Sequence, residues 1–327
     1  MRIAIVRLSA LGDIIQSMIV VQFIRKHYSE ITIDWIVDKK FFEIVKLNNS
    51  IDNVLEIRLS EIKKSRNIFH LIKHFTELKK IPRYDLVIDT QGLLKSAIIS
   101  KLIPSKETIG FDRRSAREPF ASFFYSKSFK IPYDHNVVER YCALISKALN
   151  IEILKKDIHE KTAIFQTSNY PVNNKSIVSI IVGASFESKI YPVERYQFLL
   201  DNLGAKFICL WGNKYEYSLA KKLLEMSPKV SIAEKTSLAE LLKIISKSNL
   251  VIGGDTGPTH LAWALNIPSI TLFGSTLGSR NMFETDKNLK LESDSEVDPY
   301  KINKYDLSIA EIEPKKIFSL AKRLLEG

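Results

Sequence analysis

The densest group of residues that could do chemistry is "LVIGGDTGPTHLAWAL", residues 250–265. An apolar run that predicts a strand ends in two glycines, and Pro258 then marks the first turn of a helix. The backbone amides of residues 256–259, together with the helix dipole, predict an anion site that suits a diphosphate. Asp255 and His260 flank this site, and their polar side chains suit the hydroxyl groups of a sugar. An ordinary helix capped by Asp255 is the alternative interpretation.

A second group lies near the start of the chain, in "RLSALGDIIQSM", residues 7–18. It follows "RIAIV", a short apolar strand, and opens a helix, which is the usual beginning of a nucleotide-binding α/β unit. Asp13, however, sits at the turn where a phosphate would bind, and its carboxylate would repel that phosphate. The turn therefore predicts Rossmann-like geometry in which Asp13 has a role other than phosphate binding.

A third group, "GASFESKIYPVERY", follows another predicted strand that ends at Gly183. The small residues Ala184 and Ser185, with Lys189 a few positions later, could hold a phosphate through an amide, a hydroxyl and an ammonium group. A lysine that is simply solvated in a loop is the alternative.

Basic residues are concentrated in the first half of the chain. The formal net charge is +11, and residues 95–130 contain eight Lys or Arg against three acids, with Phe and Tyr between them. Residues 61–83 add seven Lys or Arg against two acids. This clustering favours recognition of an anionic ligand, by bidentate Arg contacts to carboxylate or phosphate, over a merely compositional excess. Charge alone leaves nucleic acid open as a partner.

Several classes of protein find no support in the sequence. It lacks "GxGxxG" in the opening unit and any "GxxxxGK[ST]", which argues against a standard dinucleotide dehydrogenase and a P-loop NTPase. It also lacks "HExxH" and Cys/His clusters, so we expect no metal site. Cys142 and Cys209 lie far apart and are expected to be reduced structural thiols. No secretory h-region and no run of ~18 apolar residues is present, so we expect a cytoplasmic protein that is not integral to a membrane.

Apolar strands alternate with helical patterns along almost the whole chain, including a helix expected over about residues 13–28, and this predicts parallel α/β sheets. The pattern restarts after the polar stretch 166–176, the best candidate linker. The expected domains are therefore 1–165 and 175–305, each Rossmann-like, with a C-terminal helix, 306–327, that packs back toward the N-terminal domain. Ligands of such sheets bind beyond the carboxyl ends of the strands, so the site is expected in the cleft between the two domains.

With these motifs assembled, the chain resembles the lipopolysaccharide heptosyltransferases of glycosyltransferase family nine, which have the GT-B fold of two Rossmann-like domains. The resemblance runs nearly end to end: "SALGDIIQSM" matches the family's Gly-Asp turn, and "GGDTGPTHLAWAL" matches its donor loop. The stretch "SAREPFASFFY", residues 115–125, resembles heptosyltransferase I in particular, which adds the first heptose to the Kdo of Kdo-lipid A.

The resemblance implies a role for each matching residue. Asp13 would be the general base. The donor would be bound through its phosphates, ribose and heptose by Ser185, Lys189, Glu216, Asp255, Thr256, Gly257 and His260. The acidic acceptor would be bound by Arg113, Arg114, Arg117 and Arg140. Two departures stand out: Arg7 occupies a position where many members have Lys, and "GASFESK" lacks the paired threonines often found before the Lys.

The implied function is inverting transfer of L-glycero-D-manno-heptose from ADP-heptose to Kdo-lipid A, without metal or cofactor. Because the acceptor is lipid-anchored, peripheral association with the inner face of the cytoplasmic membrane is expected, and no nucleic acid partner. The basic segment 61–83 could serve this association, and an amphipathic helix packed on its own core explains it equally well. Heptosyltransferase II, a nucleotide-sugar epimerase and a non-catalytic lipid A- or nucleic-acid-binding protein remain as alternatives.

Overall fold

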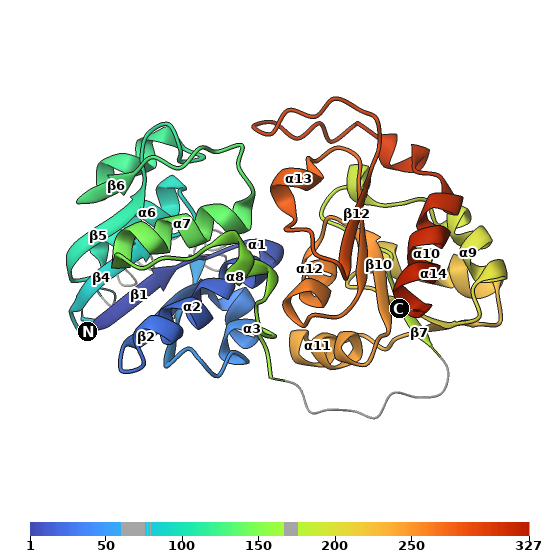
Figure 1. Ribbon diagram of the computed structural model, residues 1–327, viewed down its shortest axis with the longest axis horizontal. Helices are drawn as coiled ribbons and strands as arrows, with labels where there is room; N and C mark the ends of the chain where they lie inside the picture. The colour runs from blue at the N-terminus through green and yellow to red at the C-terminus, as the bar shows by residue number, and fades with distance from the viewer. Residues whose placement is uncertain (60–75, 77, 79, 167–175, 327) are drawn as a thin grey trace. The chain divides into compact units, whose positions relative to one another are not determined.

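The computed structural model describes residues 1–59, 76, 78, 80–166 and 176–326. The chain divides into two compact units, Met1–Gln166 and Thr167–Gly327 (Figure 1). Each unit is described by itself below.

In the described part of the first unit, six parallel strands form one sheet in the order β3-β2-β1-β4-β5-β6. The strands are β1 (Arg2–Val6), β2 (Thr32–Asp38), β3 (Asn53–Ile57), β4 (Tyr84–Asp89), β5 (Ser105–Phe111) and β6 (Lys127–Phe129). β1 pairs in parallel with both β2 and β4, so the strand order reverses between β1 and β4. Such a switch point leaves a crevice at the carboxyl ends of the two strands, where ligands of open α/β sheets bind.

Short helices connect these strands. They are α1 (Leu11–Ser17), α2 (Ile19–His27), η1 (Lys39–Phe41), α3 (Phe42–Lys46), α6 (Leu94–Leu102), η2 (Pro119–Phe124), α7 (Val137–Leu149) and α8 (Lys155–His159). The single helix expected over about residues 13–28 is in fact two helices, α1 and α2, joined at Met18. The Val21 N–H bonds to the Met18 carbonyl only three residues earlier, and this tighter turn interrupts the regular helical ladder.

The described residues of the second unit form another parallel sheet of six strands, in the order β12-β11-β10-β7-β8-β9. The strands are β7 (Ile177–Ile181), β8 (Lys206–Leu210), β9 (Val230–Ile232), β10 (Leu250–Gly254), β11 (Ser269–Phe273) and β12 (Asn288–Glu292). The helices are η3 (Glu187–Lys189), η4 (Val193–Tyr196), α9 (Gln197–Asn202), α10 (Lys214–Met226), α11 (Leu238–Ser246), α12 (Gly257–Ala264), α13 (Gly278–Asn281), η5 (Ser308–Glu311) and α14 (Pro314–Glu326). The strand order repeats that of the first unit, and its switch point lies between β7 and β10.

The sequence patterns did not predict the edge strands β6, β9 and β12, or β5 beside β6. β6 and β9 are only three residues long, and β5 and β12 carry charged residues along "SKETIGF" and "NLKLE". Central parallel strands are buried on both faces, so their sequences are continuous apolar runs. Strands at or near the edge of a sheet are less buried, so their sequences contain polar and charged residues and do not show such a run.

Within residues 306–327, the structure has the short helix η5 and then helix α14. Helix α14 buries Ile317 and Ala321 in the core of the second unit, together with residues of β10 and β11. Phe318 lies edge-on against Phe198 of α9, with ring centroids 5.6 Å apart. The helix therefore buries its apolar stripe in the core of the second unit. Its expected packing toward the N-terminal domain stays a prediction.

Most of the linker 166–176 and most of the basic segment 61–83 lie outside the described residues, so the predictions made for them stay predictions. Among the described residues, no helix combines the length and the apolar character that crossing a bilayer requires.

Candidate functional site

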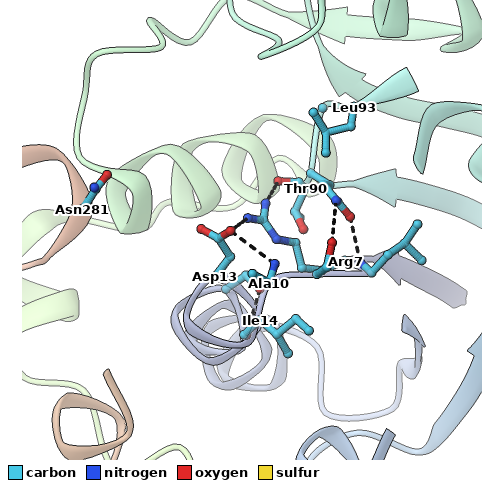
Figure 2. Close-up of polar contacts among 12 residues, drawn as sticks. Arg7, Ala10, Asp13, Ile14, Thr90, Leu93 and Asn281 are labelled. Carbon is cyan, nitrogen blue, oxygen red and sulfur yellow. Dashed lines mark hydrogen bonds and ion pairs between the residues drawn. The ribbon is translucent and has the colours of Figure 1, made fainter. Parts of the chain in front are cut away.

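In the first unit, Asp13 lies in the first turn of α1, just beyond the carboxyl end of β1 (Figure 2). Its Oδ2 forms an ion pair with Nη2 of Arg7 at 2.8 Å, and the Tyr141 hydroxyl donates a hydrogen bond to its Oδ1 at 3.4 Å. The Ala10 N–H donates to Oδ2, also at 3.4 Å. The Asp13 side chain is nevertheless 40% exposed. A carboxylate that is held in place and still reachable can accept a proton from a ligand hydroxyl.

Arg7 is the buried partner of this carboxylate. Its side chain is 7% exposed, and its Nη1 donates to the Thr90 carbonyl at 2.7 Å. The guanidinium lies 5.0 Å from the centre of the Tyr141 ring. Burial opposes the charge of Arg7, but the carboxylate of Asp13, with smaller contributions from Tyr141 and Asp89, outweighs that effect, and the pKa of Arg7 is raised above its ordinary value. A permanent positive charge at this distance stabilises the ionised form of Asp13.

Residues at the carboxyl end of β4 support the turn that carries Asp13. The Leu8 N–H donates to Oε1 of Gln91 at 2.9 Å, and Nε2 of Gln91 donates to the Ser9 hydroxyl at 3.3 Å. Lys95 also donates to the Ser9 hydroxyl, at 3.1 Å. Sequence reasoning missed Gln91 and Tyr141. The position of Gln91 just after an apolar strand was the available signal for the first of them.

In the second unit, Asp255 is the centre of a buried network directly after β10. Its Oδ2 lies 2.7 Å from Nζ of Lys189, and its Oδ1 lies 3.0 Å from Nε2 of His260. The hydroxyl of Thr276 and the amide of Asn281 also donate to Oδ2, at 2.9 and 3.2 Å. The structure thus brings together three predicted site residues and adds Thr276 and Asn281, which sequence reasoning did not identify.

The ion pair with Lys189 determines the charge state of Asp255. Burial alone would raise the pKa of this carboxyl, but the ammonium group of Lys189 and the hydrogen bond with His260 hold the pKa well below its usual range. The Lys189 side chain is only 11% exposed. The alternative of a solvated loop lysine is therefore wrong, and a phosphate bound here would share Lys189 with Asp255.

The start of α12 shows which of the amides predicted to bind an anion are available. Thr256 is the N-cap residue, in an extended conformation and without a side-chain cap, so Asp255 is not the helix cap. Pro258 has no N–H, and the Thr259 N–H bonds to the Thr256 carbonyl at 3.1 Å. The amides of Thr256 and Gly257 are the ones that the helix does not engage, and they are the remaining donors for an anion.

Gly254 lets the loop after β10 approach the segment that carries Lys189. An added Cβ at Gly254 would lie 2.0 Å from the Lys189 carbonyl oxygen. Because that oxygen belongs to the backbone, the main chain of one segment would have to move. The glycine therefore sets the distance between the two segments that the Lys189–Asp255 ion pair joins.

We expect Gly254→Ala to lower the free energy of unfolding of the second unit by about 1–3 kcal/mol, because overpacking forces backbone shifts. Urea unfolding measures the effect. Gly204→Ala is the matched control, since no heavy atom lies within 4 Å of the Cβ position there. Equal stability of the two variants would contradict the close approach.

Glu216 lies in the first turn of α10, beside the carboxyl end of β7. Its Oε2 accepts a hydrogen bond from the Gly212 N–H at 2.6 Å, and its Oε1 accepts one from Nδ2 of Asn213 at 2.7 Å. Gly183 makes room for it, because a Cβ there would lie 2.0 Å from Cδ of Glu216. Ser185 is exposed in the loop after β7. Both predicted donor residues therefore lie near the switch point of this sheet.

The four arginines predicted to bind the acceptor fall into two groups. Arg113, Arg114 and Arg117 are exposed in the loop after β5. Arg140 is 5% exposed, donates from Nη2 to the Ser115 carbonyl at 2.6 Å, and stacks on the rings of Phe111 and Tyr133. These contacts position the loop that carries the other three arginines, and the predicted contact of Arg140 with the acceptor stays a prediction.

No group of three or more His, Cys, Asp or Glu side chains that could hold a metal ion occurs among the described residues.

Comparisons with known proteins agree with this arrangement. A family model described as glycosyltransferase family 9 (heptosyltransferase) matches residues 71–287. A Campylobacter coli protein named lipopolysaccharide heptosyltransferase 1 is 40% identical, over 99% of this chain and 99% of its own length. The protein of that name from Escherichia coli is 30% identical, over 84% of this chain and 88% of its own length.

A solved structure also matches the whole chain. The Escherichia coli heptosyltransferase WaaC with ADP superposes with a TM-score of 0.82 at 23% identity, and the match covers 99% of this chain and 100% of that one. This likeness confirms the predicted fold class, α/β with two Rossmann-like units of the GT-B type.

Proposed function

The chain belongs to glycosyltransferase family 9, the heptosyltransferases, and we propose that it transfers L-glycero-D-manno-heptose from ADP-heptose to the Kdo of Kdo-lipid A. The observation that carries this proposal is the accessible Asp13 carboxylate, held by Arg7 at the switch point where other Rossmann-like units bind phosphate. The names of the curated relatives support the sugar and the lipopolysaccharide product.

Asp13 acts as the general base in this proposal. Its carboxylate accepts the proton of the attacking Kdo hydroxyl, and the oxygen forms a bond to the anomeric carbon of the heptose. The bond from that carbon to the diphosphate breaks, and ADP leaves with the bonding electrons. A single displacement of this kind inverts the anomeric configuration. Base catalysis of this type contributes about 10²–10⁴-fold.

The second unit binds the donor and stabilises the departing ADP. The amides of Thr256 and Gly257 face the developing negative charge at the start of α12, and Lys189 adds a buried positive charge. Asp255 and His260 contact the heptose hydroxyls. Glu216 binds the ribose and Ser185 supplements the phosphate contacts. The reaction requires the base of one unit and the donor loop of the other to act on the same pair of substrates.

The exposed arginines of the first unit bind the acceptor. Arg113, Arg114 and Arg117 offer planar donors that match the carboxylate of Kdo. Arg140 holds their loop through the Ser115 carbonyl. Because the acceptor is a lipid, the protein works on the cytoplasmic side of the inner membrane as a peripheral protein, and nucleic acid is not a partner.

Transfer is expected to proceed without a divalent cation or other cofactor, because Lys189 and the helix-end amides neutralise the leaving group. Treatment with EDTA followed by gel filtration should leave the initial rate of ADP release unchanged. Full loss of that rate, restored by Mg²⁺ or Mn²⁺, would contradict the assigned role of these groups.

The direct test is to incubate the protein with ADP-heptose and Kdo-lipid A and to weigh the lipid product by mass spectrometry. We expect a mass gain of one heptose. Transfer only to an acceptor that already carries one heptose would indicate heptosyltransferase II. Release of a free sugar without any lipid product would indicate an epimerase.

A further inference from the structure

Two phenylalanine side chains project from the first unit on a short turn. Phe120 is 66% exposed and Phe123 is 69% exposed, and their ring centroids lie 6.1 Å apart. Both belong to η2, a 3₁₀-helix, in which side chains three residues apart lie on the same side. Single exposed apolar residues are ordinary on protein surfaces, but a pair on one side of one turn forms a patch.

The turn beneath the two rings is firmly held. Ala121 is fully buried, and the hydroxyl of Tyr125, directly after η2, donates to the buried carboxyl of Asp89 at 2.8 Å. The Glu118 N–H donates to the Gly92 carbonyl at 3.2 Å. The Glu118 carboxylate in turn accepts the Leu94 N–H at 2.6 Å, at the start of α6. The backbone that carries the exposed rings is therefore held in place by buried contacts and hydrogen bonds.

The loop that leads into this turn supplies positive charge. Arg113, Arg114 and Arg117 are exposed, and none of them forms an ion pair with another residue of the described part of the chain. The two acids of the loop are engaged by backbone groups. Asp112 accepts the N–H groups of Arg114 and Ser115 at 3.1 and 2.9 Å, and Glu118 accepts that of Leu94. We call these arginines and the two rings, residues 113, 114, 117, 120 and 123, the aromatic–arginine patch.

The patch adjoins the residues that carry the Asp13 turn. Glu118 is bonded to Leu94, which is itself 39% exposed. The next residue, Lys95, donates to the Ser9 hydroxyl, four positions before Asp13. Leu94 and Lys95 thus link the patch to the turn that carries the carboxylate used as the base in the proposed function.

We propose that the aromatic–arginine patch docks the first unit on an anionic lipid bilayer. Phe120 and Phe123 enter the boundary between headgroups and acyl chains. The arginines, which hold the Kdo carboxylate when the acceptor is bound, bind lipid phosphates when it is not. Exposed aromatic rings beside basic side chains match both layers of such a surface, the apolar and the anionic. This proposal rests on the proposed function, because docking on a membrane would bring a lipid-borne acceptor to Asp13.

Flotation with vesicles tests the docking itself, in the absence of ADP-heptose and of acceptor. We expect the wild-type chain to float with vesicles that contain phosphatidylglycerol and to stay behind with pure phosphatidylcholine. Phe120→Ser/Phe123→Ser should weaken binding to the anionic vesicles by about tenfold or more. Tyr300→Ser/Tyr305→Ser is the matched control, because these rings of the second unit are 65% and 93% exposed, and it should bind like the wild type.

A second variant keeps the test independent of the two rings. Arg113→Gln/Arg114→Gln should also bind anionic vesicles more weakly, and the binding that remains should depend less on salt concentration. Wild-type flotation by the phenylalanine variant, or equal binding to neutral and anionic vesicles, would overturn the proposal.

Activity measurements separate this proposal from the proposed function. The phenylalanine variant should transfer heptose to a soluble Kdo glycoside at the wild-type rate, and about tenfold more slowly to Kdo-lipid A in anionic vesicles. An equal loss with both acceptors would place the rings in the sugar site and overturn docking. No transfer by the wild type to either acceptor would refute the proposed function, while flotation would still decide on the patch.

Discussion

Asp13→Asn is expected to reduce heptose transfer by about 10²–10⁴-fold while the affinity for ADP stays at the wild-type level. The amide keeps the size of the side chain and an oxygen for the Ala10 N–H, but it cannot accept a proton. The donor residues belong to the second unit and are untouched. Initial rates of ADP release and calorimetric binding of ADP measure the two quantities.

Asp157→Asn provides a matched control for the structural part of this effect. Asp157 lies in the first turn of α8, as Asp13 lies in that of α1, and each accepts the N–H three residues earlier. Both variants lose the charge at a helix-end contact, but Asp13→Asn also removes the counter-ion of the buried Arg7 and should cost more stability. Only Asp13→Asn should lose turnover. Wild-type turnover in Asp13→Asn would remove Asp13 from the role of base.

Lys189→Met is expected to have the second-largest effect, on stability as well as on donor binding. The ion pair with Asp255 is buried on both sides, and removal of one partner leaves a buried charge uncompensated. Such a loss costs about 3–5 kcal/mol. We expect a lower urea midpoint for the second unit and a large loss of affinity for ADP.

The double variant Lys189→Met/Asp255→Asn separates these two effects. It removes both charges, so most of the stability should return, whereas ADP should still bind weakly because the ammonium group is missing. ADP is the suitable probe, because it lacks the heptose that Asp255 is proposed to contact. If the stable double variant binds ADP as tightly as the wild type, Lys189 has a structural role alone.

Much of the architecture was predictable from apolar patterns. The strands "RIAIV", "YDLVIDTQ" and "NLVIGG" are central and buried on both faces, so their hydrophobic runs were plain in the sequence. The C-terminal helix expected over 306–327 begins only at Pro314, as α14. The short outer strands β6 and β9 carried no such signal. The apolar stripe of α14 did not by itself reveal that it packs on β10 and β11, because such a stripe does not specify which core it will meet.

The sequence by itself determined the fold class and the turns where chemistry lies, because strand–turn–helix patterns with glycine, acid and proline at set spacings are local properties of the chain. Only the tertiary structure decided what each side chain does at those turns. It joined Lys189 to Asp255 across 66 positions and Tyr141 to Asp13 across 128 positions, and it buried Arg140 while leaving Arg113 and Arg117 in solvent. Ion pairing and burial depend on distances between residues far apart in the chain, and local patterns do not contain those distances.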